Sequence, residues 1–216
     1  ISPDDFPEIE INEELTPLKI NSSVLKRVLT KTAFSMASQD VRYYLNGMLL
    51  EVNGSKINGV ATDGHRLAFS SSSLVDSNLE VRNILPRKAV LELSKLLSAD
   101  DEDINLMIGP SYIEVKSENL SFSSKLIDGK YPDYDKVFPT GNPLPVEIRK
   151  DLLQAALSRA SVLSNEKYRG VRFQLSENKL KLTANNPEQE SAEEELSVTY
   201  NGTDLEVGFN IGYLLD

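Results

Sequence analysis

The sequence predicts an α+β protein built from repeated units, each with a helix followed by antiparallel strands. Three observations predict this class: amphipathic segments with helical spacing, strand pairs that flank Gly-containing turn dipeptides, and recurrence of the helix-and-strand pattern about 125 residues along the chain. With 216 residues, 40% of them hydrophobic, the chain is long enough to bury a core and form one or two domains.

The chain is expected to begin with a connector and a helix. Residues 1–18 are acidic and show no lasting period, which is typical of a linker or the end of a preceding domain. Residues 22–37 then carry apolar side chains on one helical face, and Asn21 or Ser22 can cap the helix by accepting a backbone N–H bond. The residues of that face are Leu25, Val28, Leu29, Thr32 and Met36.

Two hairpins are predicted after this helix. Asn53-Gly54 separates Tyr43–Val52 from Lys56–Thr62, and Asp63-Gly64 separates the second of these strands from His65–Ser71. Asn-Gly and Asp-Gly favour two-residue hairpin loops because both turn positions need a positive φ. The chain therefore changes here from helix to antiparallel strands.

The remaining elements follow the same alternation. A second helix is expected from Pro86, with proline at its first position, where a missing N–H costs nothing. Residues 128–145 are interpreted as a linker, 149–170 as a helix with its exit, and 171–187 as another hairpin. The strands expected between the second helix and the linker are Ile104–Ile108, Tyr112–Lys116 and Leu120–Leu126.

The segment after the linker repeats the first helix and hairpin. The alignment starts by placing Val24 on Leu152. Further along, it places Leu29 on Leu157, Lys31 on Arg159, Phe34 on Val162 and, after a five-residue gap, Gly47 on Gly170. A weaker repeat lies inside the first unit, where each of the two helices is followed by three strands.

The charge distribution separates the helices from the rest of the chain. The net charge is −10, which argues at first against nucleic-acid binding. Residues 22–37 nevertheless carry +3, residues 86–98 carry +2 and residues 149–169 carry +3. A solvated helix face explains one such helix, but three of one sign in an acidic chain indicate a surface that attracts a polyanion. Such a surface would contact DNA phosphates without reading the base sequence.

Known catalytic patterns are missing from the sequence. There is no cysteine and one histidine, His65, with no G-x-S-x-G elbow or phosphate-binding loop, and the acidic run Asp100–Asp103 lacks the glycine and distal glutamate of a calcium loop. Paired carboxylates for acid–base chemistry stay possible among 33 acidic residues, but nothing singles out a pair. We therefore expect a non-enzyme without cofactor or metal, and keep a hydrolase using His65 as an outside alternative.

The stretch V-A-T-D-G-H-R-L-A-F-S, residues 60–70, allows two interpretations. If a strand begins at His65, then His65, Leu67 and Phe69 share one face. The first interpretation is a buried strand with a hydrogen-bonded histidine. The second is a shallow apolar recess, rimmed by Arg66, that accepts a partner peptide.

Several blocks of the sequence resemble the bacterial sliding clamp, the beta subunit of the replicative DNA polymerase. In chain order these blocks are V-R-Y-Y-L-N-G-M, A-T-D-G-H-R-L-A, I-L-P-R-K-A-V-L-E-L, S-S-K-L-I-D-G-K-Y-P-D-Y, L-S-N-E-K-Y-R-G-V-R and T-A-N-N-P-E-Q-E-S-A-E-E-E-L. The resemblance runs from about Phe6 to Asp216. It implies a homodimeric ring of clamp-fold domains, with helices on the inner face and sheets outside.

The resemblance also implies a domain division and a function. Residues 1–18 would be a connector or the end of a preceding clamp domain, residues 19–138 the complete middle domain, and residues 139–216 the first part of the last domain. The family acts as a non-catalytic processivity factor in the cytoplasm, at the nucleoid. It encircles duplex DNA and binds polymerases, the clamp loader and repair proteins through peptides. The alternative is a monomeric peptide-binding module that cannot encircle DNA.

Three sets of site residues follow from the resemblance. The peptide-binding pocket would contain Leu45, Thr62, Gly64, His65, Arg66, Leu67, Pro132, Val137, Tyr168 and Tyr213. The DNA-contacting positions would be Lys26, Arg27, Gln39, Tyr43, Tyr44, Arg87, Lys88 and Arg159. The subunit interface would include Val162, Leu163, Glu188 and Glu190, within a region that extends to Glu195. Lys136 stands where the family often has arginine, which would weaken a planar contact, and Tyr168 stands where phenylalanine is common.

Overall fold

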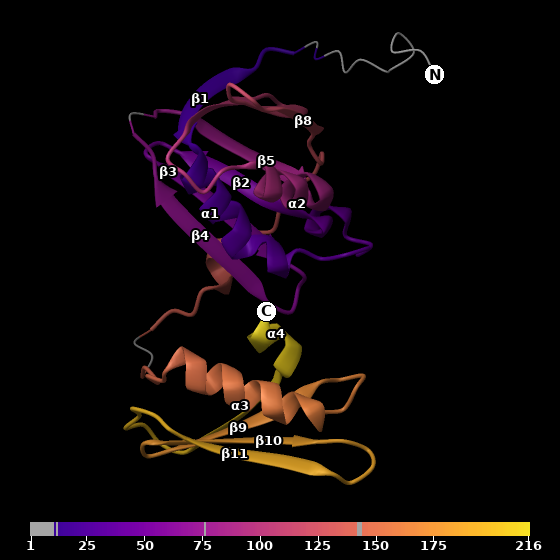
Figure 1. Cartoon of the computed structure of the whole chain (residues 1–216), viewed down its shortest axis with the longest axis vertical. Helices are drawn as coiled ribbons and strands as arrows, with labels where there is room; N and C mark the ends of the chain where they lie inside the picture. Colours follow the sequence, from indigo (N-terminus) through magenta and orange to yellow (C-terminus); the bar gives the residue numbers. More distant parts are fainter. Residues whose placement is uncertain (1–10, 12, 76, 142–143) are drawn as a thin grey trace. The chain divides into compact units, whose positions relative to one another are not determined.

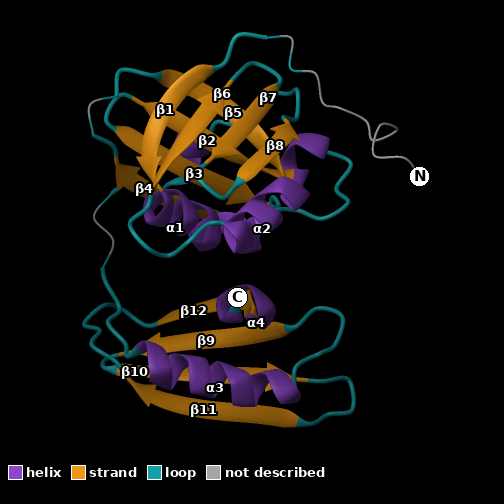
Figure 2. Cartoon of the chain, turned by 45° about the horizontal axis from the view of Figure 1, so that its top comes forward, coloured by secondary structure: helices purple, strands orange, loops and turns teal. Residues whose placement is uncertain are grey.

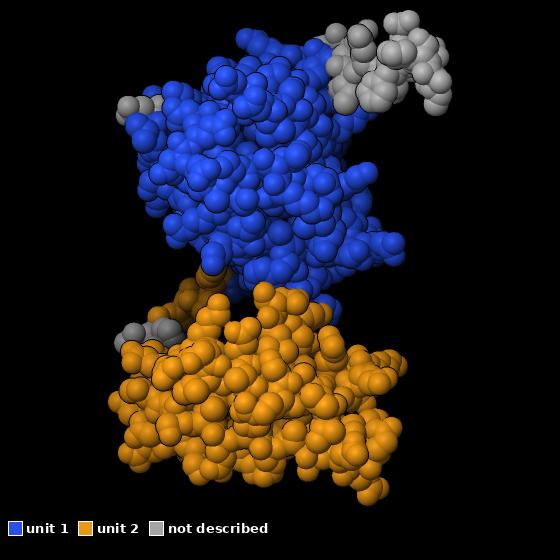
Figure 3. Space-filling view, in the orientation of Figure 1, with its two compact units in different colours: residues 1–137 blue, residues 138–216 orange. Residues whose placement is uncertain are grey.

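The chain divides into two compact units, which are coloured separately in Figure 3: unit 1, residues 1–137, and unit 2, residues 138–216. The computed structural model describes residues 11, 13–75, 77–141 and 144–216. The first ten residues of the expected connector, with the start of the resemblance at Phe6, lie outside the described residues.

Unit 1 contains two four-stranded antiparallel sheets, in the orders β4-β3-β2-β5 and β1-β6-β7-β8. Their strands are β1 (Thr16–Asn21), β2 (Gly47–Asn53), β3 (Lys56–Thr62), β4 (Leu67–Ser73), β5 (Glu80–Pro86), β6 (Asp103–Ile108), β7 (Tyr112–Lys116) and β8 (Ser121–Lys125). The first sheet combines β2, β3 and β4, which follow the first helix, with β5, which precedes the second helix. The second sheet combines β6, β7 and β8, which follow the second helix, with β1, which precedes the first helix. The predicted α+β class and the repeat inside this unit are confirmed.

Two helices lie side by side against the strands of unit 1, α1 (Ser22–Thr32) and α2 (Arg87–Leu96) (Figures 1 and 2). Asn21 is the cap of α1, since its side-chain oxygen accepts the Ser23 N–H at 2.9 Å. The prediction that helix continues to residue 37 was wrong. A short 3-10 turn, η2 (Ala33–Ser35), follows Thr32, and the backbone is extended at Met36.

Three turn predictions need correction. The second hairpin loop holds four residues instead of two, because Thr62 pairs with Leu67. The first loop is centred on Gly54-Ser55, since Asn53 pairs with Lys56. Residues expected to begin a strand form instead a second 3-10 turn, η3 (Tyr43–Asn46). Pattern alone cannot set such boundaries when the tertiary packing decides where pairing stops.

Other element boundaries in the structure also differ from the predicted ones. The strand β1 begins at Thr16, inside the expected connector, and β5 was not foreseen because its Glu, Arg and Asn residues hide its alternation. Pro86 ends β5 and caps α2, with φ −58° and ψ 144°, so it precedes the helix instead of starting it. The expected linker 128–145 contains a third 3-10 turn, η4 (Tyr134–Val137), and its first half is packed onto unit 1.

Unit 2 repeats half of this architecture. Helix α3 (Lys150–Val162) packs on β10 and β11 of one antiparallel sheet, whose order is β11-β10-β9-β12, as α1 packs on β3 and β4 (Figure 2). The remaining elements are β9 (Gly170–Ser176), β10 (Lys179–Asn185), β11 (Ser191–Ser197), β12 (Leu205–Asn210) and α4 (Ile211–Leu215). Gly47 begins β2 and Gly170 begins β9, so the sequence alignment of the two glycines is confirmed.

Both faces of the sheet β4-β3-β2-β5 are covered. Met48, Leu50 and Val52 of β2 belong to the main core that includes α1 and α2. The alternate residues face the other way, where a second cluster contains Leu49 and Tyr134. The candidate site lies on this second face of the sheet. No helix among the described residues is long and apolar enough to cross a membrane.

Candidate functional site

A groove of about 360 Å³ lies in unit 1, beside the turn between β3 and β4. Its walls come from three segments: residues 42–45 at the start of η3, the turn with its flanking strand ends (62–67), and residues 132–137. The lining residues are Arg42, Leu45, Thr62, Gly64, His65, Arg66, Leu67, Pro132, Tyr134 and Val137. The structure thus brings together eight of the ten residues in the predicted pocket. Sequence reasoning missed Arg42 and Tyr134, although both stand inside the blocks that carry the resemblance.

The Asp63 carboxylate shapes the turn that forms one wall. One of its oxygens, Oδ1, accepts the backbone N–H groups of His65 at 2.9 Å and Arg66 at 3.1 Å, while Oδ2 pairs with Arg66 Nε at 3.2 Å. The next residue, Gly64, has a φ of +88°, which disfavours other residues. His65 is therefore in an exposed turn and not in a buried strand, as the first interpretation required.

Arg42 joins this turn to the loop before β2. Its guanidinium binds both carboxylate oxygens of Asp40, at 3.0 and 2.8 Å, and donates to the Asp63 carbonyl at 3.2 Å. The side-chain amide of Asn46 closes the same loop by contacting the Asp40 backbone N–H and C=O, both at 2.8 Å. The bonds from Arg42 lower the pKa of Asp40 from 3.8 to about 2.

The Asp40–Arg42 pair gives a testable pH dependence. A carboxylate whose pKa is depressed by folding stabilises the loop above pH 3.8, and this contribution is lost as the pH falls toward 2. We expect NMR titration of the Asp40 carboxyl to give a midpoint near 2, and Arg42→Gln to raise it toward 3.8. Asp151, which pairs with Arg149 in unit 2, is the internal control and should titrate identically in both proteins. An unchanged Asp40 midpoint in the variant would contradict this role of Arg42.

Arg66 forms a fixed cationic rim. Besides its pair with Asp63, its Nη2 donates to the Phe34 carbonyl at 2.8 Å, and its guanidinium carbon lies 5.3 Å from the centre of the Phe34 ring. The side chain of Leu45 is buried and forms the floor, whereas Val137 is 64% exposed and lies at the edge. An apolar floor beside fixed donors is suited to a peptide that inserts apolar side chains and offers carbonyl or carboxylate oxygens at the rim.

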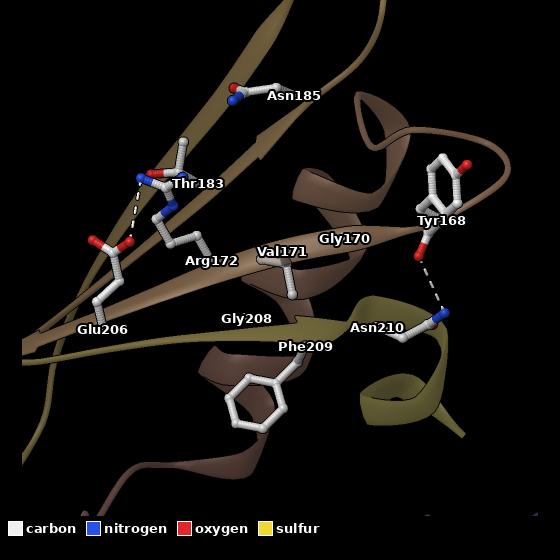
Figure 4. Close-up of a pocket in the computed structure, with 10 residues that line it drawn as sticks. All are labelled: Tyr168, Gly170, Val171, Arg172, Thr183, Asn185, Glu206, Gly208, Phe209 and Asn210. Carbon is white, nitrogen blue, oxygen red and sulfur yellow. Dashed lines mark hydrogen bonds and ion pairs between the residues drawn. The ribbon is translucent and has the colours of Figure 1, made fainter. Parts of the chain in front are cut away.

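The other two predicted pocket residues belong to unit 2. Asn210 holds them near each other: its Nδ2 donates to the Tyr168 carbonyl at 3.3 Å, and its Oδ1 accepts the Tyr213 N–H at 3.3 Å. Tyr168 also borders a hollow of about 560 Å³ on the sheet of unit 2, shown in Figure 4. Gly170 and Gly208 line this hollow. Because glycine has no side chain, the strands leave open space at these two positions.

The predicted DNA-contacting cations fall into two groups. Three are held by the protein itself: Lys26 donates to the Leu97 carbonyl at 2.8 Å, Arg87 donates to the Met36 carbonyl at 2.9 Å, and Arg159 binds both carboxylate oxygens of Glu194, at 2.7 and 2.8 Å. By contrast, the side chains of Arg27 and Lys88 are exposed and make no hydrogen bond or ion pair with the described residues.

The uncharged residues among the predicted DNA-contacting positions, Gln39, Tyr43 and Tyr44, lie around the loop before β2. Gln39 has a positive φ of +59°, an uncommon conformation that the Asp40–Asn46 contacts help to hold. Tyr43 is 58% exposed and meets the half-buried Tyr44 edge to face, at a centroid distance of 5.7 Å.

The predicted interface residues lie at the end of α3 and before the edge strand β11. Val162 is 78% exposed, and Leu163 is half-buried. Glu188 is exposed, and Glu190 is tied to Asn186, whose Nδ2 donates to its carboxylate at 2.7 Å. Lys136, also singled out from the sequence, pairs with Asp133 at 2.7 Å.

Comparison with known proteins gives a consistent result. The family model described as DNA polymerase III beta subunit, central domain, matches residues 19–133, and the one for the C-terminal domain matches residues 135–216. The chain is 50% identical to the beta sliding clamp of Pseudomonas aeruginosa over 213 residues, and 48% identical to that of Escherichia coli K12 over 212 residues. Each alignment covers 98% of this chain and 58% of the relative, so the chain spans less than two thirds of their length.

Solved structures agree in fold. The crystal structure of the DNA polymerase III subunit beta from Pseudomonas aeruginosa superposes with a TM-score of 0.95 at 49% identity, covering all of this chain and 59% of that one. A sliding clamp from the same organism, bound to griselimycin, also gives 0.95 at 49% identity and covers all of this chain and 58% of that one. The predicted clamp fold is confirmed by these superpositions.

Proposed function

Because this chain belongs to the beta subunit family of DNA polymerase III, the beta sliding clamps, we propose that it acts in a processivity factor. In this proposal the protein encircles duplex DNA as a homodimeric ring and tethers polymerases, the clamp loader and repair proteins. It carries out no chemistry itself and works in the cytoplasm at the nucleoid. Residues 19–138 would be the middle domain and residues 139–216 part of the last domain.

The groove in unit 1 is the observation that carries this proposal. Its floor is apolar, its rim holds Arg42 and Arg66 in fixed orientations, and its lining includes the turn at Asp63-Gly64. A relative of the same fold has been solved with griselimycin bound. We propose that griselimycin and partner peptides occupy this groove in the present protein, with apolar groups on the floor.

Val137 provides a direct test of the groove. It is 64% exposed, so Val137→Asp should leave the fold intact while placing a charge at the apolar edge of the groove. We expect the affinity for griselimycin to fall about 10-fold, or about 1.4 kcal/mol, measured by NMR titration of the Thr62–Leu67 amides. Val75→Asp is the matched control, because Val75 is 85% exposed and is not part of the groove lining. Equal affinities of the two variants would exclude this groove as the binding site.

A peptide-binding module that does not encircle DNA is the second candidate. It is favoured by one observation: every residue that lines the groove belongs to unit 1, so this part of the site needs no second copy. Mass in solution and retention on DNA separate the two functions. A ring is dimeric and stays on closed circular DNA but slides off the same DNA after linearisation. A module is monomeric and shows no such difference.

A further inference from the structure

Glu51 is a buried carboxylate in the middle of the sheet β4-β3-β2-β5. Its residue is 8% exposed, and it lies on the sheet face that carries the groove cluster. Burying a charge costs free energy unless hydrogen bonds and counter-charges surround it. Three partners do so here: Tyr134 Oη donates to Oε2 at 2.7 Å, Asn58 Nδ2 donates to the same oxygen at 3.1 Å, and Arg82 Nη1 lies 3.4 Å from Oε1.

Tyr134 connects this buried carboxylate to the groove. It is 6% exposed, its hydroxyl reaches Glu51, and its residue lines the groove. The ring also stacks on Phe69 of β4, at a centroid distance of 5.9 Å. Burial raises the pKa of the Tyr134 hydroxyl, and the hydrogen bond to Glu51 raises it further, so this group stays a donor at neutral pH.

The groove wall depends on a few attachments to the sheet. It is formed by residues 131–137, whose regular structure is the single turn η4, and short 3-10 turns are weak on their own. Pro132 and Val137 are exposed. Their neighbours Tyr131 and Tyr134 are buried, and Tyr131 Oη accepts the Thr62 N–H at 3.1 Å. Two hydrogen bonds therefore attach the wall to the sheet, one at the end of β3 and one in the middle of β2, and the stacking of Tyr134 on Phe69 adds a contact to β4.

The surroundings of Glu51 show that the carboxylate is accommodated at a cost. Asn58 gives its amide N–H to Glu51, and its own Oδ1 is buried without a hydrogen-bond partner among the described residues. The neighbouring inward positions on the same face, Leu49 and Val60, are apolar. Replacing Glu51 together with its buried polar partners by apolar residues would remove this cost, so stability alone does not account for a glutamate there.

We infer that Glu51 is a positioning residue of the groove: through the Tyr134 hydroxyl it holds the wall of Pro132, Tyr134 and Val137 against the sheet. This inference rests on the proposed function of the groove as a ligand site. A wall that samples other positions lowers affinity in proportion to the time it spends away from the binding-competent one.

The test compares substitutions at Glu51 and Tyr134. Glu51→Met is apolar and of similar length but removes the acceptor, whereas Glu51→Gln keeps an oxygen for Tyr134 and Asn58. We expect Glu51→Met to weaken griselimycin binding about 10-fold and Glu51→Gln to stay within about 3-fold of the unmodified chain. Amide hydrogen exchange at residues 134–137 should accelerate in Glu51→Met, while exchange in β2 and β3 stays slow.

The double variant Glu51→Met with Tyr134→Phe separates positioning from stability. It removes both partners of the hydrogen bond, so the midpoint of thermal unfolding should recover relative to Glu51→Met. Affinity should stay low, because the hydrogen bond that attaches the wall to β2 is still missing. Tyr134→Phe alone, which removes one hydroxyl oxygen, should give the same loss of affinity and the same faster exchange.

Two results would overturn the inference: unchanged exchange at residues 134–137 in Glu51→Met, or recovery of affinity together with stability in the double variant. The second result would make Glu51 a residue of the fold only. If the unmodified chain does not bind griselimycin in the groove, the proposed function fails. The exchange measurement uses no ligand and still decides whether Glu51 holds the wall.

Discussion

Gly59→Val is expected to destabilise unit 1 by about 3 kcal/mol, the upper part of the usual range for overpacking a core. Gly59 lies in β3 directly beneath α1, and a Cβ added there would be 2.6 Å from Val28 Cγ1 and 3.3 Å from the Val28 carbonyl oxygen. Val28 and Thr32 of α1 are fully buried, and the Thr32 hydroxyl donates to the Val28 carbonyl at 2.8 Å. The helix cannot retreat from the sheet without opening the core on both sides of this contact.

Gly208→Val is the matched control for this substitution. Gly208 also lies in a strand, β12, but an added Cβ would have nothing within 4 Å. Valine favours strands, so this change should alter the stability of unit 2 by less than about 0.5 kcal/mol. Urea unfolding followed by resolved amide signals reads each unit separately. A similar shift of the midpoint for both variants would show that the α1–β3 contact is not tight.

Asp63→Ala should reduce griselimycin affinity about 100-fold, the largest effect that we expect at the groove. The substitution removes the acceptor of two backbone N–H groups and the partner of Arg66 Nε, so the turn loses the bonds that hold its shape. Asp63 lies between strands and not in the core, and the global stability should change by less than about 1 kcal/mol. Isothermal titration calorimetry measures the affinity, and thermal unfolding measures the stability.

Asp63→Asn isolates the charge from the shape of the turn. Asparagine keeps an oxygen for the His65 and Arg66 N–H groups and loses the ion pair with Arg66. We expect a loss of about 10-fold, between the unmodified chain and the alanine variant. If alanine and asparagine weaken binding equally, the two backbone bonds do not determine the groove, and the charge near Arg66 does.

The sequence could predict the parts of the fold that depend on local pattern. The apolar spacing of Leu25, Val28 and Leu29 predicted the buried face of α1, and all three side chains are fully buried. The alignment of Gly47 with Gly170 predicted that the same strand begins in both units. Strand β5 was missed because Arg82 and Asn83 interrupt its pattern, and both faces of the sheet beside it are covered by other segments.

The candidate site was predictable only where its residues stand in a recognisable block. Eight lining residues could be identified by resemblance, and the structure places them around one groove. The roles of Arg42 and Tyr134 depend on what they contact far away in sequence: Arg42 donates to the Asp63 carbonyl, and Tyr134 donates to Glu51. Periodicity carries no signal for such contacts, since they arise when segments already folded by other forces come together.

The exchange of single strands between the two sheets of unit 1 also sets the order in which this unit can fold. Among the described strands, β1 pairs only with β6, from Thr16 opposite Ile108 to Asn21 opposite Asp103. A ribosome that adds roughly 5–20 residues per second therefore releases β1 several seconds before its partner exists. The nascent chain can form α1 and the β2–β3–β4 meander first, but the core beneath β1 closes late, by a long-range pairing of the kind that slows folding.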